Sequence, residues 1–180
     1  RGLDLFRERF REHEESLGGV TVRVLYPRGH GRNVAHALAA LRFAWPRLTE
    51  RYGPYPYSTL TVVHPPAFAD AAGGMEYPTL ITTGGPWFAS LGTRAVESVT
   101  IHELGHQWFY GLLASNEHQS PVLDEGLTSY VEGRLLREAY GAGSAVAWPG
   151  LMISMDALRR AHAAALAHDD VVTQPAPDFA

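Results

Sequence analysis

The chain has 180 residues and a formal charge of −4, which fits a single domain. All fifteen basic residues are arginine and there is no cysteine, so lysine Schiff bases, disulfides and thiolate ligands are excluded. The mild charge gives no reason to expect a nucleic acid or an anionic membrane as partner. No apolar run reaches membrane-spanning length and the first residues do not resemble a signal peptide. We therefore expect a soluble chain and leave its compartment open.

The first third of the chain predicts two strands around one long helix. Residues 20–26 alternate and are rich in β-branched side chains, which is typical of a strand. Residues 33–51 carry an apolar stripe at helical spacing, with Asn33 as the expected N-cap. Pro46 lies inside that stripe and is expected to kink or restart the helix. Residues 59–64 predict a second strand, which the two prolines that follow it are expected to end.

Residues 73–83 predict a loop that leads into an edge strand. Pro78 interrupts this segment, and proline is tolerated in a sheet mainly at an exposed edge. An exposed edge can accept an extended peptide by strand addition. The backbone groups of Gly73, Gly74 and Met75 are therefore candidates for binding a peptide substrate.

The sequence His-Glu-Leu-Gly-His at residues 102–106 lies in a segment, residues 94–114, that we expect to be helical. Residues four apart on a helix project from the same face, with β-carbons about 5–6 Å apart. His102 and His106 can therefore bind one Zn²⁺ ion as neutral imidazoles. Glu103 lies beside the first histidine and is the candidate general base, which takes a proton from the attacking water.

A catalytic zinc ion needs a third protein ligand and one open position. Glu125 follows His106 after 18 intervening residues. This length is enough to end the first helix, cross a polar loop and begin a second helix at residues 122–140. From the first turn of that helix, Glu125 can face back onto the histidine pair as the third ligand. The apolar side of the second helix is expected to consist of Leu123, Leu127, Val131 and Leu135.

The rest of the chain predicts one more helix. Residues 141–143 break the second helix with two glycines, and residues 147–168 are expected to form a third helix. Strands that precede a run of helices indicate an α+β fold.

Taken together, the motifs resemble those of the M1 aminopeptidases, a family of zinc metallopeptidases within the gluzincins. The resemblance rests first on residues 102–106 followed by Glu125. Residues 73–77, Gly-Gly-Met-Glu-Tyr, are similar to the Gly-x-Met-Glu-Asn exopeptidase motif of the family, and residues 53–57 resemble a segment that precedes a strand there. The matches span residues 53–132 in the order that the family has.

Some positions depart from the family pattern. Tyr77 and Asp124 stand where the family usually has asparagine, and residues 127–128 are Leu-Thr in place of Phe-Ala. These departures concern the preferred substrate more than the metal site.

The resemblance implies a thermolysin-like zincin catalytic lobe, with a small mixed sheet and an edge strand followed by helices. Residues 1–17 would then enter this sheet as an extended segment. Residues 1–180 would form one metallopeptidase catalytic domain, without the N-terminal β domain and C-terminal helical part of the family.

The implied reaction is hydrolysis of a peptide bond next to a free amino terminus, with Glu76 pairing with the substrate's α-ammonium group. The family tyrosine that stabilises the oxyanion lies further past the third ligand than the 55 residues that follow Glu125. Loss of an oxyanion donor costs about 10²–10³-fold in kcat, so we expect this chain to bind zinc and to be weakly active.

Three other interpretations remain open from the residues. The chain can be an endopeptidase of the broader gluzincin type, or a non-catalytic peptide-binding module that retains the zinc lobe. The zinc site can also be purely structural, in which case His118, in the loop between the two helices, is the best candidate for a fourth ligand.

Overall fold

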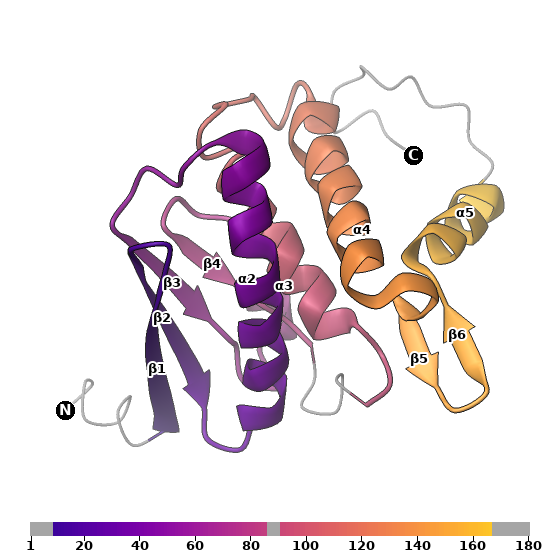
Figure 1. Cartoon of the computed structure of the whole chain (residues 1–180), viewed down its shortest axis with the longest axis horizontal. Coiled ribbons are helices and arrows are strands. Elements are labelled where there is room, and N and C mark those ends of the chain that lie inside the picture. Colours follow the sequence, from indigo (N-terminus) through magenta and orange to yellow (C-terminus); the bar gives the residue numbers. More distant parts are fainter. Residues whose placement is uncertain (1–8, 86–90, 167–180) are drawn as a thin grey trace.

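The structure, a computed structural model, describes residues 9–85 and 91–166. It contains a four-stranded sheet in the order β1-β2-β3-β4 beside a group of helices (Figure 1). Strands β1 (Phe10–Leu17) and β2 (Val20–Pro27) are antiparallel, whereas β3 (Thr59–Val63) and β4 (Leu80–Thr82) continue the sheet in parallel. This small mixed sheet followed by helices confirms the predicted α+β class.

Helix α2 (Gly31–Tyr52) connects the parallel strands β2 and β3, which cannot be joined by a tight turn. Its apolar face shares one buried core with the inward side chains of the sheet. The helix runs through Pro46, so the predicted restart is wrong. Asn33 is not the N-cap either, because the helix begins earlier, after His30. Asn33 is buried instead, with its amide nitrogen 3.5 Å from the carbonyl oxygen of Gly85.

A short 3₁₀ turn, η1 (Asp70–Ala72), precedes the segment that lies along the outer side of β4. The Gly74 amide donates to the Thr82 carbonyl over 3.1 Å, and the Thr82 amide donates to the Met75 carbonyl over 2.8 Å. Residues 74–75 therefore extend the sheet past β4 as its edge, with the proline-containing turn between the two paired segments.

Helix α3 (Ala95–Gly105) ends nine residues before the predicted boundary at residue 114. Beyond Gly105 the backbone turns become irregular. The Trp108 amide donates to the Gly105 carbonyl three residues back over 3.0 Å, whereas the Gly111 amide donates to the His106 carbonyl five residues back over 2.8 Å. Glycine at 105 and 111 weakens an α-helix at this point. His106 lies directly after the last residue of α3 and keeps helical dihedral angles.

The second predicted helix has the predicted bounds, but it begins with a π-helical turn, η2 (Val122–Gly126), before α4 (Leu127–Tyr140). The wide turn rotates the following side chains relative to a regular helix. Leu123, inside this turn, and Leu127, directly after it, are exposed, so the predicted apolar side is wrong at these two positions. Val131 and Leu135 are buried as expected.

The predicted helix at residues 147–168 is wrong over its described part, residues 147–166, and residues 167–168 lie outside the described ranges. After the 3₁₀ turn η3 (Gly141–Gly143), strands β5 (Val146–Trp148) and β6 (Leu151–Ile153) form a hairpin, and α5 (Met155–Leu166) follows. The Pro-Gly pair between the strands is a turn signal that the helical interpretation overlooked. Within the described ranges, no helix has both the length and the apolar character needed to cross a membrane.

The hairpin is attached to the residues that lead into α3. The indole nitrogen of Trp148 donates to the Leu91 carbonyl over 3.0 Å, and the Ala147 amide donates to the Gly92 carbonyl over 2.9 Å. Gly92 has a φ of +79°, and a β-carbon there would lie 1.5 Å from the Trp148 indole nitrogen. The hairpin therefore requires glycine at position 92.

The need for glycine at position 92 can be tested with a matched pair of variants. Gly150 has the same φ of +79° but no atom within 4 Å of an added β-carbon. We expect Gly92→Ala to lower the free energy of unfolding in urea by about 1–3 kcal/mol more than Gly150→Ala, because only position 92 adds steric overlap to the backbone strain. Equal losses would contradict the packing of Trp148 on Gly92.

Candidate metal centre

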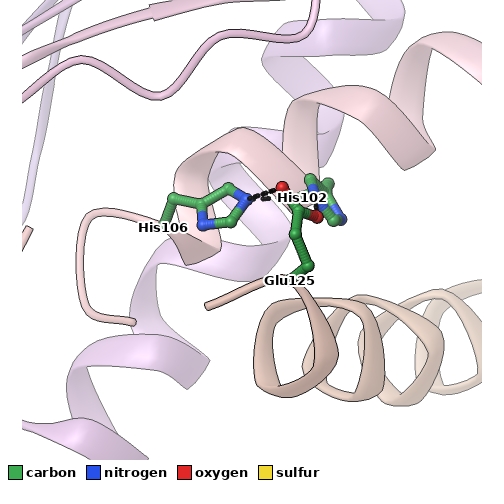
Figure 2. Close-up of side chains that lie close together, drawn as sticks. All are labelled: His102, His106 and Glu125. Atoms are coloured by element: carbon green, nitrogen blue, oxygen red, sulfur yellow. Dashed lines mark hydrogen bonds and ion pairs between the residues drawn. The ribbon is translucent and has the colours of Figure 1, made fainter. Parts of the chain in front are cut away.

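Three side chains from two neighbouring elements converge on one point (Figure 2). His102 lies in the last turn of α3, and His106 is the residue directly after the end of that helix. Glu125 lies in the π-helical turn η2. The Nε2 atoms of the two histidines lie 3.1 Å apart. Oε2 of Glu125 lies 3.1 Å from His102 Nε2, and Oε1 of Glu125 lies 3.6 Å from His106 Nε2.

These separations match the edges of a coordination tetrahedron. Bonds of about 2.0–2.1 Å to zinc place neighbouring ligand atoms about 3.3–3.4 Å apart. In the described part of the chain, two groups of side chains lie close enough together to hold a metal ion, and the three predicted ligand residues form one of them. The donor set of two imidazoles and one carboxylate therefore fits a divalent ion of the zinc type, with the exposed side of Glu125 toward solvent.

The second ring nitrogen of each histidine faces a carboxylate. His102 Nδ1 lies 3.3 Å from Oε2 of Glu132, and His106 Nδ1 lies 2.6 Å from Oδ1 of Asp124. Glu132 is itself held by the Ser98 hydroxyl and the Arg159 guanidinium. A hydrogen bond between Nδ1 and Glu132 fixes the orientation of the His102 ring and leaves its Nε2 free to bind a metal. At His106 the Asp124 contact is a close approach without hydrogen-bond geometry, and the Thr128 hydroxyl lies 3.3 Å from the same Nδ1.

The charges of the three candidate ligands depend on one another. Burial lowers the pKa of His102, but hydrogen bonds to Glu125 and Glu132 outweigh this effect and raise the pKa to about 10. Burial and then the charge of His102 lower the pKa of His106 to about 4. The hydrogen bond from His102 lowers the pKa of Glu125. A cation that binds here displaces the proton of His102, so its affinity depends on pH.

Glu103 lies in a pocket of about 350 Å³ beside these ligands. Besides Glu103, the pocket is lined by glycines 73, 74, 84 and 85 and by the side chains of His102 and Glu132. The Glu103 carboxylate is buried, and one of its oxygens has no hydrogen-bond partner among the described residues. Burial raises the pKa of this carboxyl to about 8. A pKa close to neutral pH suits a group that accepts and then returns a proton.

Comparison with known proteins gives the family of the chain. The Peptidase family M1 domain matches residues 46–176, which is well over half of the chain. The chain belongs to peptidase family M1. Aminopeptidase B of Rattus norvegicus is 35% identical over 92 residues, which are 51% of this chain and 14% of that protein. Leukotriene A-4 hydrolase of Xenopus laevis is 34% identical over 90 residues, which are 49% of this chain and 14% of that protein.

A third relative is aminopeptidase RNPEPL1 of Mus musculus, 33% identical over 100 residues that are 54% of this chain. The M1 chain thus covers only 13–14% of the length of these three relatives. The family match includes both the histidine pair and Glu125, but it does not reach the first strands of the sheet.

In the M1 chain, Glu76 belongs to the second group of side chains that could hold a metal ion, and all three members of this group are acidic. Carboxylate oxygens of Glu76, Glu117 and Asp124 all lie within 4.8 Å of one another. Burial is the main reason that the pKa of Glu76 is raised, and the charges of Glu125 and Glu117 add to it. The group therefore offers several carboxylates to a cation at a short distance from the candidate metal centre.

Several residues of this site were not identified from the sequence. Glu132 lies seven residues, or two helical turns, after Glu125, and that spacing was an available signal. Asp124 and Glu117 carry no such pattern, because their positions depend on the π-helical turn and the loop before it. His118 is exposed and belongs to neither group of metal-binding side chains in the described ranges, which gives no support to it as a fourth ligand.

Proposed function

We propose that this M1 chain is a zinc-dependent aminopeptidase lobe that hydrolyses the peptide bond next to a free amino terminus. The observation that carries the proposal is the spacing of 3.1, 3.1 and 3.6 Å between the side-chain atoms of His102, His106 and Glu125. We also propose that residues 1–180 form one catalytic domain of the thermolysin-like zincin type, and that it holds one Zn²⁺ ion.

When bound, Zn²⁺ polarises the scissile carbonyl and makes the attacking water more acidic. Glu103 accepts the proton of that water from its position in the pocket and then donates it to the departing amine. Glu132 keeps the His102 ring in the orientation that directs its Nε2 atom to the ion, and the Asp124 carboxylate lies 2.6 Å from Nδ1 of the His106 ring. The edge formed by Gly73, Gly74 and Met75 aligns the substrate backbone by strand addition.

The acidic group around Glu76 favours a substrate with a free amino terminus. A peptide α-ammonium group can form a charge-assisted hydrogen bond with Glu76, and Glu117 and Glu125 add negative charge nearby. An internal peptide segment has no cation to place there. This difference supports exopeptidase over endopeptidase action.

The proposal is tested by comparing leucine 4-nitroanilide with its N-acetyl counterpart in the presence of Zn²⁺. We expect the free amine to be hydrolysed with a kcat/KM about 10–100-fold higher, which corresponds to one hydrogen bond to a charged group. A chelator should abolish the activity. Faster hydrolysis of the acetylated compound would favour an endopeptidase, and zinc binding without any turnover would favour the peptide-binding module.

A further inference from the structure

Gln107, the residue after His106, has a fully buried side chain that the proposed reaction does not use. Its amide group reaches the turn that follows Glu76. The Thr79 amide donates to Gln107 Oε1 over 2.9 Å, and Gln107 Nε2 donates to the Tyr77 carbonyl over 3.2 Å. The same nitrogen lies 3.5 Å from the Glu76 carbonyl oxygen. One side chain thus contacts backbone groups of three residues, Glu76, Tyr77 and Thr79, on a single turn.

This turn has a backbone conformation that it would not readily keep alone. Thr79 has a φ of +62°, which is disfavoured for a β-branched residue. The Thr79 carbonyl accepts from Thr61 in β3, and the Leu80 amide closes the turn onto Tyr77 over 2.9 Å. Such a conformation persists only where the surroundings hold it from several sides. Gln107 supplies the contacts from the side of the metal centre.

We propose that Gln107 is a positioning residue that fixes Glu76 relative to the metal centre. His106 is a proposed ligand of the ion, and the next residue, Gln107, holds the turn that follows Glu76. The distance between the bound α-ammonium group and the scissile carbonyl is then set by the backbone rather than by a loose loop. The inference rests on the proposed function and adds the means by which the site selects the first residue of a peptide.

A merely structural role for Gln107 predicts something different. If the side chain only satisfies buried backbone groups, its loss would reduce the amount of folded, zinc-binding protein and leave KM unchanged. If it positions Glu76, its loss weakens the binding of the free amine in ground and transition states alike. Such uniform binding affects KM and not kcat.

The test uses Gln107→Met, which is similar in shape but lacks both hydrogen-bonding groups. We expect KM for leucine 4-nitroanilide to rise about 10-fold, with kcat and zinc affinity close to wild type, because a small displacement of an anchoring group is costly. Thr100→Val is the matched control, since it removes a buried hydrogen bond of 2.7 Å to the Val96 carbonyl in α3, the helix that precedes Gln107. We expect no change of KM in the control. An unchanged KM in Gln107→Met would overturn the inference.

A double variant shows whether Gln107 acts through Glu76. In a Glu76→Gln background, adding Gln107→Met should raise KM by less than about twofold, because the two residues belong to one interaction. A further 10-fold rise would overturn the inference.

Amide exchange separates this inference from the proposed function. Loss of its acceptor should make the Thr79 amide of Gln107→Met exchange at least about 10-fold faster than in the wild type. An unchanged rate overturns the inference whether or not the substrate is hydrolysed. Faster exchange in a chain that binds zinc but never hydrolyses free-amine substrates would refute the proposed aminopeptidase and leave the contact between Gln107 and the turn established.

Discussion

Glu103→Gln should lower kcat for leucine 4-nitroanilide by about 10²–10⁴-fold, the usual contribution of general acid–base catalysis. The amide keeps the shape of the side chain but cannot accept a proton from water. Because Glu103 does not belong to the convergent group of His102, His106 and Glu125, zinc affinity should stay close to wild type. Steady-state kinetics and a zinc titration on the same preparation measure the two quantities.

The control for this result is another buried carboxylate on the same helix. Glu97 lies in α3, is buried, and pairs with His36 over 2.8 Å and with Arg94 over 3.1 Å, away from the pocket. Any effect of Glu97→Gln should appear in stability and not in kcat of the folded fraction. Unchanged activity of Glu103→Gln would remove Glu103 from the mechanism.

Glu125→Ala should weaken zinc binding by more than about 100-fold, beyond the range seen when only an outer partner of a ligand is lost. Only the imidazoles of His102 and His106 then remain of the three candidate ligands. The Glu125 side chain is 57% exposed, so the change should leave the fold intact. Zinc should consequently raise the melting temperature of the wild type by mass action and have little effect on the variant.

Glu138→Ala provides the comparison for Glu125→Ala. Glu138 is a partly exposed carboxylate of α4 that pairs with Arg51 over 2.8 Å, so its loss removes the same charge without touching the candidate ligands. Equal loss of zinc affinity in both variants would mean that net charge, and not coordination by Glu125, controls binding.

The parts of the site that depend on local spacing could be predicted from the sequence. His102 and His106 lie together because both belong to one helical turn, and this holds even though α3 ends just before His106. The prediction of Glu125 as third ligand needed one further condition, a loop that brings the chain back to the histidine pair. The 18 residues between His106 and Glu125 are long enough for such a loop. The strands could be predicted for a similar reason, since alternation and β-branched side chains act over a few residues.

The rest of the site depends on contacts between distant segments. The π-helical turn at residues 122–126 could not be predicted from an apolar stripe; in and directly after it, Leu123 and Leu127 are exposed while Asp124 faces His106. The β5–β6 hairpin forms where a helix was expected, because its strand pairs with the residues before α3. Gln107 gave no sequence signal at all, because its hydrogen bonds reach a turn about thirty residues earlier in the chain.

Determining where zinc binds in the wild-type chain tests the central claim most directly. Anomalous scattering from a crystal grown with Zn²⁺ should show one ion bonded to Nε2 of His102 and of His106 at about 2.0–2.1 Å and to the Glu125 carboxylate at about 2.0–2.2 Å. A protein-free coordination position should face the pocket that contains Glu103. An ion bound elsewhere, or one that only some of these three side chains reach, would contradict the account.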